Sequence, residues 1–145
     1  MCRLVETNKL KVAFISGKGK IPDFNKAVDR LYSFFYKTGQ EKFIDVCLIG
    51  LFYSKYGGRY SACLPVKEGV KVGGDIRIRV LPSQKAVLAV HKGGYKTIDE
   101  SFDKIFKFIK KRGFRWKFPV REEYIKAEGK ESDYITNIYV PIAED

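Results

Sequence analysis

The fold is decided by residues 97–113, which read TIDESFDKIFKFIKKRG. Apolar side chains recur in this stretch at the three- and four-residue spacing that is typical of an amphipathic helix. We expect Thr97 and Glu100 to form a capping box at its start, and Gly113 to end it. The stretch therefore predicts a helix with one apolar stripe that must pack against another element. The residues of this stripe are Ile98, Phe102, Ile105, Phe106 and Ile109.

A second stretch with the same pattern lies 74 positions earlier, and it predicts a helix over about residues 23–37. The shift also places Gly39 on Gly113 and Gly19 on Gly93, and the apolar residues 12–15 on residues 86–89. A strand, a glycine loop, a helix and a terminal glycine in one common register indicate a duplicated unit. The apolar stripe of the earlier helix consists of Phe24, Val28, Leu31, Tyr32 and Phe35.

Strand-like stretches follow each predicted helix and are joined by short glycine turns at 57–58, 73–74 and 129. Short turns favour antiparallel pairing, since parallel strands need long crossover connections. We therefore predict an α+β fold of two pseudo-symmetric strand–helix–strand–strand modules, with an antiparallel sheet covered on one side by two helices. The modules would span about 9–82 and 83–145 of a single domain over residues 1–145. The predicted strands are residues 46–53, 60–66, 75–80, 120–126 and 135–142.

The amino-acid composition bears on whether the protein binds nucleic acid. The 145 residues carry 28 Lys and Arg against 17 Asp and Glu, a net charge of +11 that invites a nucleic-acid hypothesis. The basic residues of 104–112 lie largely opposite the apolar stripe, as on a solvated helix face, and the remaining ones are scattered. We therefore do not expect a nucleic-acid partner.

The longest apolar run, residues 46–53, is far shorter than the roughly 20 residues of a membrane helix, so no membrane association is expected.

Cysteine and histidine usage argues against a metal site. Cys2, Cys47 and Cys63 are odd in number and lack CxxC spacing, which fits a reducing cytoplasm better than a disulfide framework. We expect Cys47 to be a buried small apolar residue. His91 is the single histidine, and it is either a structural residue at a strand end or an acid/base group. We expect no metal ion and no cofactor.

The most informative stretch is residues 116–124, WKFPVREEY. Strand alternation predicts Glu122 and Tyr124 on one face, and Arg121 and Glu123 on the other. A carboxylate among aromatic rings attracts a cationic or proton-donating ligand. If it is buried without a partner, its pKa rises and it can act as a general acid or base. The alternative is an exposed glutamate, or one that Arg121 or a lysine neutralises.

The order of these motifs resembles the GyrI-like small-molecule-binding superfamily. This family includes the effector-binding domains of multidrug-responsive transcription activators and the gyrase-inhibitory proteins. Residues 85–95, KAVLAVHKGGY, are similar to its strand that ends in His-x-Gly-x-Tyr. Residues 122–124, EEY, resemble its Glu-x-Tyr strand, and residues 138–142, IYVPI, its closing strand. Residues 14–19 and 31–37 look like the standalone branch, so the resemblance covers nearly the whole chain.

The resemblance implies a tandem fold with a ligand groove between the modules, where a glutamate is commonly ringed by aromatic side chains. By motif, Glu122 takes this place with Tyr124 beside it, and Tyr53, Tyr36 and Trp116 are expected walls. The implied function is a standalone cytoplasmic domain that binds an amphipathic or aromatic ligand, cationic ligands included. No helix-turn-helix segment fits before the first predicted strand.

Two alternatives stay open at the level of sequence, including whether the protein is an enzyme at all. Some standalone relatives are implicated in hydrolysing strained cyclopropane-containing electrophiles. In that case Glu122 would deprotonate a water molecule, and Tyr124 would assist at the leaving oxygen. The other alternative is a protein partner, such as DNA gyrase, that the chain would inhibit.

Overall fold

The computed structural model describes residues 1–54 and 58–143, so the predicted turn at 57–58 includes Gly57, which lies outside the described residues. The chain divides into two compact units. The α1 unit is Lys9–Pro82, and the α2 unit combines Met1–Asn8 with Ser83–Asp145. Each unit is a small antiparallel sheet with one helix.

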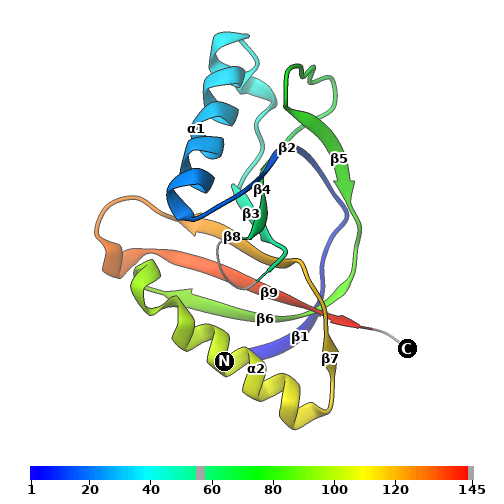
Figure 1. The fold of residues 1–145 in the computed structure, drawn as a ribbon, viewed down its shortest axis with the longest axis vertical. Coiled ribbons are helices and arrows are strands. Elements are labelled where there is room, and N and C mark those ends of the chain that lie inside the picture. The colour runs from blue at the N-terminus through cyan, green and yellow to red at the C-terminus, as the bar shows by residue number, and fades with distance from the viewer. Residues whose placement is uncertain (55–57, 144–145) are drawn as a thin grey trace. The chain divides into compact units, whose positions relative to one another are not determined.

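In the α1 unit, the strand order is β5-β2-β4-β3 and every pairing is antiparallel. The helix α1 packs on β2 and β4, where it buries Phe24, Ala27, Leu31 and Phe35 (Figure 1). This is the face that the apolar stripe predicts, with Ala27 added. The elements are β2 (Leu10–Lys18), α1 (Ile21–Lys37), the 3-10 turn η1 (Glu41–Phe43), β3 (Ile49–Phe52), β4 (Arg59–Pro65) and β5 (Arg77–Leu81).

In the α2 unit, the strand order is β1-β6-β9-β8, and β7 pairs with the end of β9. The helix α2 packs on β6 (Figure 1). Ile105 and Ile109 of this helix are buried in the core of the unit. The elements are β1 (Cys2–Glu6), β6 (Lys85–Lys92), the 3-10 turn η2 (Tyr95–Thr97), α2 (Ile98–Arg112), β7 (Arg115–Trp116), β8 (Val120–Lys126), the 3-10 turn η3 (Glu131–Asp133) and β9 (Ile135–Ala143).

The predicted α+β fold with duplicated modules is confirmed. Gly39 and Gly113 follow the two helices at φ values of 66° and 71°, the left-handed conformation that ends a helix and that glycine adopts without strain. The strand registers also repeat, because Val12 lies opposite Pro65 in one unit and Ala86 lies opposite Pro141 in the other. The two halves therefore share one plan of pairing as well as one sequence pattern.

The edge strands β1 and β5 do not pair with the strand that follows each of them in the sequence, a feature that the sequence pattern did not predict. The first residues of the chain form β1, which pairs with β6 of the α2 unit. The strand that precedes β6 is β5, and it pairs with β2 of the α1 unit. Residues 2–6 were missed as a strand because only two of their side chains are partly buried, which leaves no apolar alternation to read.

Two local expectations are wrong. The strand expected over 46–53 begins only at Ile49, and the residues before it are irregular: Val46 is 80% exposed and Cys47 is only partly buried. An apolar run does not by itself define a strand, since it lacks a period that could mark its start.

The side chain of Thr97 does not cap α2. Its hydroxyl donates instead to the Gly94 carbonyl at 3.2 Å.

His91 is a structural residue that holds the end of β6 against the start of α2. Its ring is 4% exposed, with Nδ1 2.7 Å from the Ser101 hydroxyl and Nε2 3.0 Å from the Gly94 carbonyl oxygen. A carbonyl oxygen only accepts, so Nε2 carries a proton and donates it to the Gly94 carbonyl.

We expect His91→Ala to lower the free energy of unfolding by about 1–3 kcal/mol, because it removes the partner of the buried Ser101 hydroxyl and one of the donors to the Gly94 carbonyl. Urea unfolding would measure this loss. The neighbouring exposed Lys92→Ala is the control and should change stability by less than about 0.5 kcal/mol. Equal stabilities of the two variants would contradict the structural role of His91.

Candidate functional site

Glu122 and Tyr124 lie on the helix side of the α2-unit sheet. In the pairing of β8 with β9, Glu122 is opposite Ile138 and Tyr124 is opposite Thr136. Residues directly opposite each other in a ladder share a face, and Ile138 is fully buried in the core beneath α2. The strand therefore places a carboxylate beside an apolar core, where water solvates it poorly.

A hydrogen bond joins the two side chains: the Tyr124 hydroxyl donates to Glu122 Oε1 at 2.9 Å. Burial raises the pKa of Glu122 from 4.5 to about 7, and the hydrogen bond from Tyr124 lowers it by a smaller amount. Burial also raises the pKa of Tyr124 well above 10, and the neighbouring charge of Glu122 adds to this. Tyr124 is thus a permanent donor at neutral pH, whereas Glu122 exchanges its proton there.

Two further tyrosines complete a tyrosine cluster, which we define as Tyr95, Tyr124 and Tyr134. The Tyr95 ring is 6.0 Å from the Tyr124 ring in an edge-to-face contact and 5.7 Å from the Tyr134 ring. Burial raises the pKa of Tyr95, with contributions from Tyr134 and Glu122. Tyr95 remains 40% exposed, so solvent reaches the cluster along its ring.

No cation neutralises Glu122 among the residues that the structure describes. Arg121, the candidate partner, points to the opposite face and forms an ion pair with Glu123 at 2.9 Å. Its guanidinium also lies 5.0 Å above the Tyr139 ring. The alternative in which Arg121 neutralises Glu122 is therefore wrong, and the predicted alternation of these four residues along β8 is confirmed.

Of the other predicted site residues, Trp116 belongs to the α2 unit, whereas Tyr36 and Tyr53 belong to the α1 unit. Trp116 packs on Phe106 and Phe118, each with ring centroids 4.9 Å from its own. Trp116 lies opposite Ile142 of β9, whereas Glu122 lies opposite Ile138 of the same strand. These two positions are four residues apart, which is roughly 13 Å along a strand. Tyr36 is 63% exposed on α1, and Tyr53 follows β3. Their role as ligand walls stays a prediction.

Sequence reasoning did not assign Tyr95 and Tyr134 to the site. Tyr95 could have been assigned from the sequence, since it is the last residue of the HKGGY stretch on which the family resemblance rests. Tyr134 stands between a 3-10 turn and β9 and carries no local signal. Its proximity to Tyr95 follows only from the pairing of β6 with β9, including the hydrogen bond from Gly93 N–H to the Tyr134 carbonyl.

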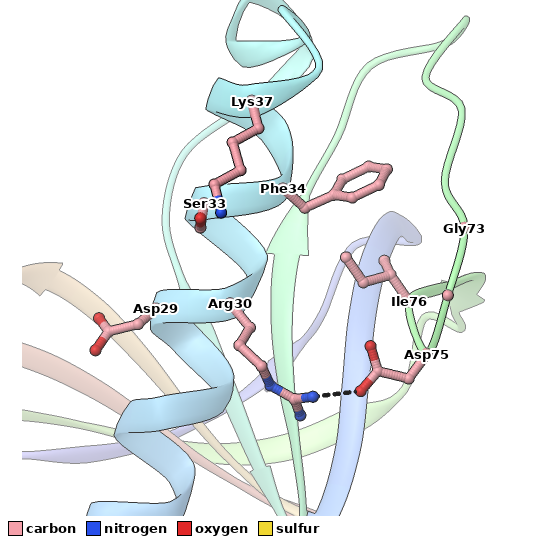
Figure 2. Close-up of a pocket in the computed structure, with 9 residues that line it drawn as sticks. Asp29, Arg30, Ser33, Phe34, Lys37, Gly73, Asp75 and Ile76 are labelled. Carbon is pink, nitrogen blue, oxygen red and sulfur yellow. Dashed lines mark hydrogen bonds and ion pairs between the residues drawn. The ribbon is translucent and has the colours of Figure 1, made fainter.

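An open hollow of about 590 Å³ lies in the α1 unit between α1 and the loop at Gly73–Ile76 (Figure 2). Phe34 and Ile76 supply its apolar lining, and Arg30 pairs with Asp75 at 2.6 Å on its rim. None of the predicted site residues lines it. Its lining holds two acidic and two basic side chains, of which Arg30 and Asp75 form an ion pair.

Within residues 1–54 and 58–143, no three His, Cys, Asp or Glu side chains are grouped so that they could hold a metal ion. Neither helix in this part of the chain is long and apolar enough to cross a membrane. The candidate site presents one carboxyl group, that of Glu122, and the three phenols of the tyrosine cluster.

Comparisons with known proteins agree with this architecture. The family described as GyrI-like small molecule binding domain matches residues 1–143. No curated protein matches the chain significantly. Among solved structures, EcmrR in an EcmrR–DNA complex has a TM-score of 0.85 at 18% identity. That match covers 100% of this chain but only 58% of EcmrR.

Two further structures match over most of both chains. A hydrolase encoded by lin2189 from Listeria innocua has a TM-score of 0.76 at 14% identity, with 98% of this chain and 91% of that one covered. SAV2435 bound to tetraphenylphosphonium has a TM-score of 0.62 at 16% identity, with 99% and 94% covered. At these identities the likeness shows a shared fold.

Proposed function

The chain belongs to the family of GyrI-like small molecule binding domains, and on this premise we propose that it binds amphipathic or aromatic small molecules, cationic ones included, at Glu122. One observation carries the proposal. The Glu122 carboxyl group is buried beside the tyrosine cluster and has no cationic partner among the described residues.

A bound cation would supply the charge that this site lacks. The ionised carboxylate is costly where it is poorly solvated, and a cation within a few ångströms would stabilise it and lower its pKa. The faces of tyrosine rings attract cations as well, and they add contact area for an aromatic ligand. Glu122 and the tyrosine cluster therefore favour a ligand that combines positive charge with rings.

Tetraphenylphosphonium, the ligand bound to SAV2435, has both properties and is a suitable probe. We expect it to bind about tenfold more tightly at pH 8 than at pH 6, since the ionised fraction of Glu122 rises from roughly one tenth to nine tenths around a pKa of about 7. Isothermal titration calorimetry at the two pH values would measure the change.

Two variants separate this site from general electrostatics. Glu122→Gln should weaken binding at pH 8 and abolish the pH dependence, whereas Glu123→Gln, one residue away on the opposite face, should retain both. A Glu122→Gln protein that binds the probe with wild-type affinity and wild-type pH dependence would refute the proposed site.

The groove between the two modules remains a prediction from the family resemblance. Its predicted walls are still Tyr36, Tyr53 and Trp116. Alanine substitution of each tests them one at a time. Loss of tetraphenylphosphonium binding in a variant that unfolds like the wild type would support the corresponding wall.

A hydrolase is the second candidate function, and the pKa of Glu122 favours it because a base is most useful when its pKa lies near the working pH. Glu122 would take a proton from water while the water oxygen bonds to an electrophilic ring carbon. A strained C–C bond of the ring would break, and the carbon that keeps its electron pair would take up the proton that Glu122 removed from water. Turnover that is lost in Glu122→Gln while binding is kept would support the enzyme. Binding without any wild-type turnover would support the sensor.

A further inference from the structure

The strands of the α1 unit are cationic throughout. β2, β3, β4 and β5 contain no aspartate or glutamate, and their charged residues are Lys11, Lys18, Arg59, Arg77 and Arg79. Residues 9–82 as a whole hold 14 Lys and Arg against six Asp and Glu, an excess of eight within the +11 of the chain. Most of the positive charge therefore resides in one unit.

Two of these arginines converge on one phenol, on the sheet face that α1 does not cover. Arg79 starts from β5 at one edge, crosses the sheet 5.7 Å above the Phe14 ring, and donates from Nη1 to the Tyr53 hydroxyl at 3.3 Å. Tyr53 follows β3, which is two strands away from β2 in the α1 unit. The guanidinium of Arg59 lies 5.3 Å from the centroid of the same Tyr53 ring.

The face is assigned from the strand register. Arg79 is opposite Val12, and Arg59 is opposite Lys18, on the side of β2 that alternates away from α1. The hydrogen bond of 2.8 Å between the hydroxyls of Ser16 and Ser61 lies on the same side.

Neither guanidinium has a carboxylate partner among the described residues. The nearby acids are engaged elsewhere: Glu68 pairs with Lys11, Asp75 pairs with Arg30, and Asp23 accepts from the Lys20 amide. Arg59 and Arg79 are exposed, so an ion from solvent can reach them. Two like charges that meet at one ring repel each other unless an anion lies between them.

We propose that Arg59, Arg79 and Tyr53 form an anion-binding site for the carboxylate or phosphate group of a small aromatic molecule. The guanidinium forks match the oxygen geometry of such a group, and the rings of Phe14 and Tyr53 provide stacking surface for the attached ring. The convergence on a single ring fits one anionic group better than the repeated phosphates of a nucleic acid. The site selects an anionic group, the opposite charge from the ligand proposed for Glu122.

Phenyl phosphate is the probe, with inorganic phosphate and phenol as its two halves. Calorimetry should show tighter binding of phenyl phosphate than of either half. Arg59→Gln and Arg79→Gln should each weaken it about tenfold or more, the loss expected for a hydrogen bond to a charged group. Arg→Lys at either position keeps the charge but removes the fork, and should give an intermediate loss.

The control with the matched charge change is Lys26→Gln, which removes an exposed cation of α1 and should leave phenyl phosphate binding unchanged. Unchanged affinity in both arginine variants, or an equal loss in Lys26→Gln, would overturn the proposal. A single-stranded oligonucleotide that displaces phenyl phosphate with a steep salt dependence would also overturn it, in favour of a nucleic-acid surface.

Discussion

Glu122→Gln is expected to raise the free energy of unfolding above pH 7 by about 3 kcal/mol, and to leave it nearly unchanged at pH 4. Burial raises the folded-state pKa of Glu122 to about 7, whereas an unfolded chain titrates near 4.5. Between these values the unfolded state loses its proton first, so the wild-type protein loses stability as the pH rises from about 4.5 to 7. Glutamine has no proton to lose and escapes this loss.

Urea unfolding at pH 4, 5, 6, 7 and 8 would measure the effect. The control is Glu123→Gln, which breaks the ion pair with Arg121 but leaves Glu122 in place. It should keep the decline between pH 4.5 and 7 that Glu122→Gln abolishes. Parallel pH profiles for wild type and Glu122→Gln would show that Glu122 is solvated like an ordinary surface carboxylate.

A stabilising substitution at Glu122 would bear directly on function. Natural proteins accept a stability loss where a site must hold an unfavourable group. A ligand cation that stabilises the carboxylate would recover part of the loss, so tetraphenylphosphonium should raise the stability of the wild type more than that of Glu122→Gln above pH 7.

Leu31→Ala and Ile105→Ala are each expected to lower the free energy of unfolding by about 2–5 kcal/mol. The two side chains occupy equivalent positions of the duplicated modules, 74 residues apart, and both are 0% exposed. Truncation removes buried methyl groups and leaves a cavity under the helix, in the α1 unit for Leu31 and in the α2 unit for Ile105.

Denaturant unfolding followed by circular dichroism would measure both losses. Lys104→Ala, next to Ile105 but exposed, is the control and should change stability by less than about 0.5 kcal/mol. A loss below about 1 kcal/mol in either core variant would mean that the helix in question does not bury its predicted stripe.

Sequence patterns predicted most of the helices and part of the strands. The stripes of both helices were readable because side chains three and four residues apart share a helix face. Gly39 and Gly113 were readable as helix ends because few other residues adopt their conformation without strain. The strand at residues 2–6 was not, since its pairing with β6 joins residues 79 to 87 positions apart.

The candidate site was likewise only partly predictable from the sequence. Strand alternation placed Glu122 and Tyr124 on one face and Arg121 and Glu123 on the other. It could not decide which of the two glutamates Arg121 would neutralise in three dimensions, and it gave no reason to include Tyr134. Those answers depend on β9, which brings Asn137 to Glu123 and Thr136 to Tyr124.

The sequence by itself therefore determined the duplicated helices, the fold class and the pair Glu122 and Tyr124, because each follows from a short-range period of the backbone. Only the tertiary structure decided that Glu122 lacks a cation among the described residues, that Tyr95 contacts both Tyr124 and Tyr134, and that Arg59 and Arg79 both contact Tyr53. These features depend on strand register and on the reach of side chains across a sheet. Both are set by long-range packing, which no local period records.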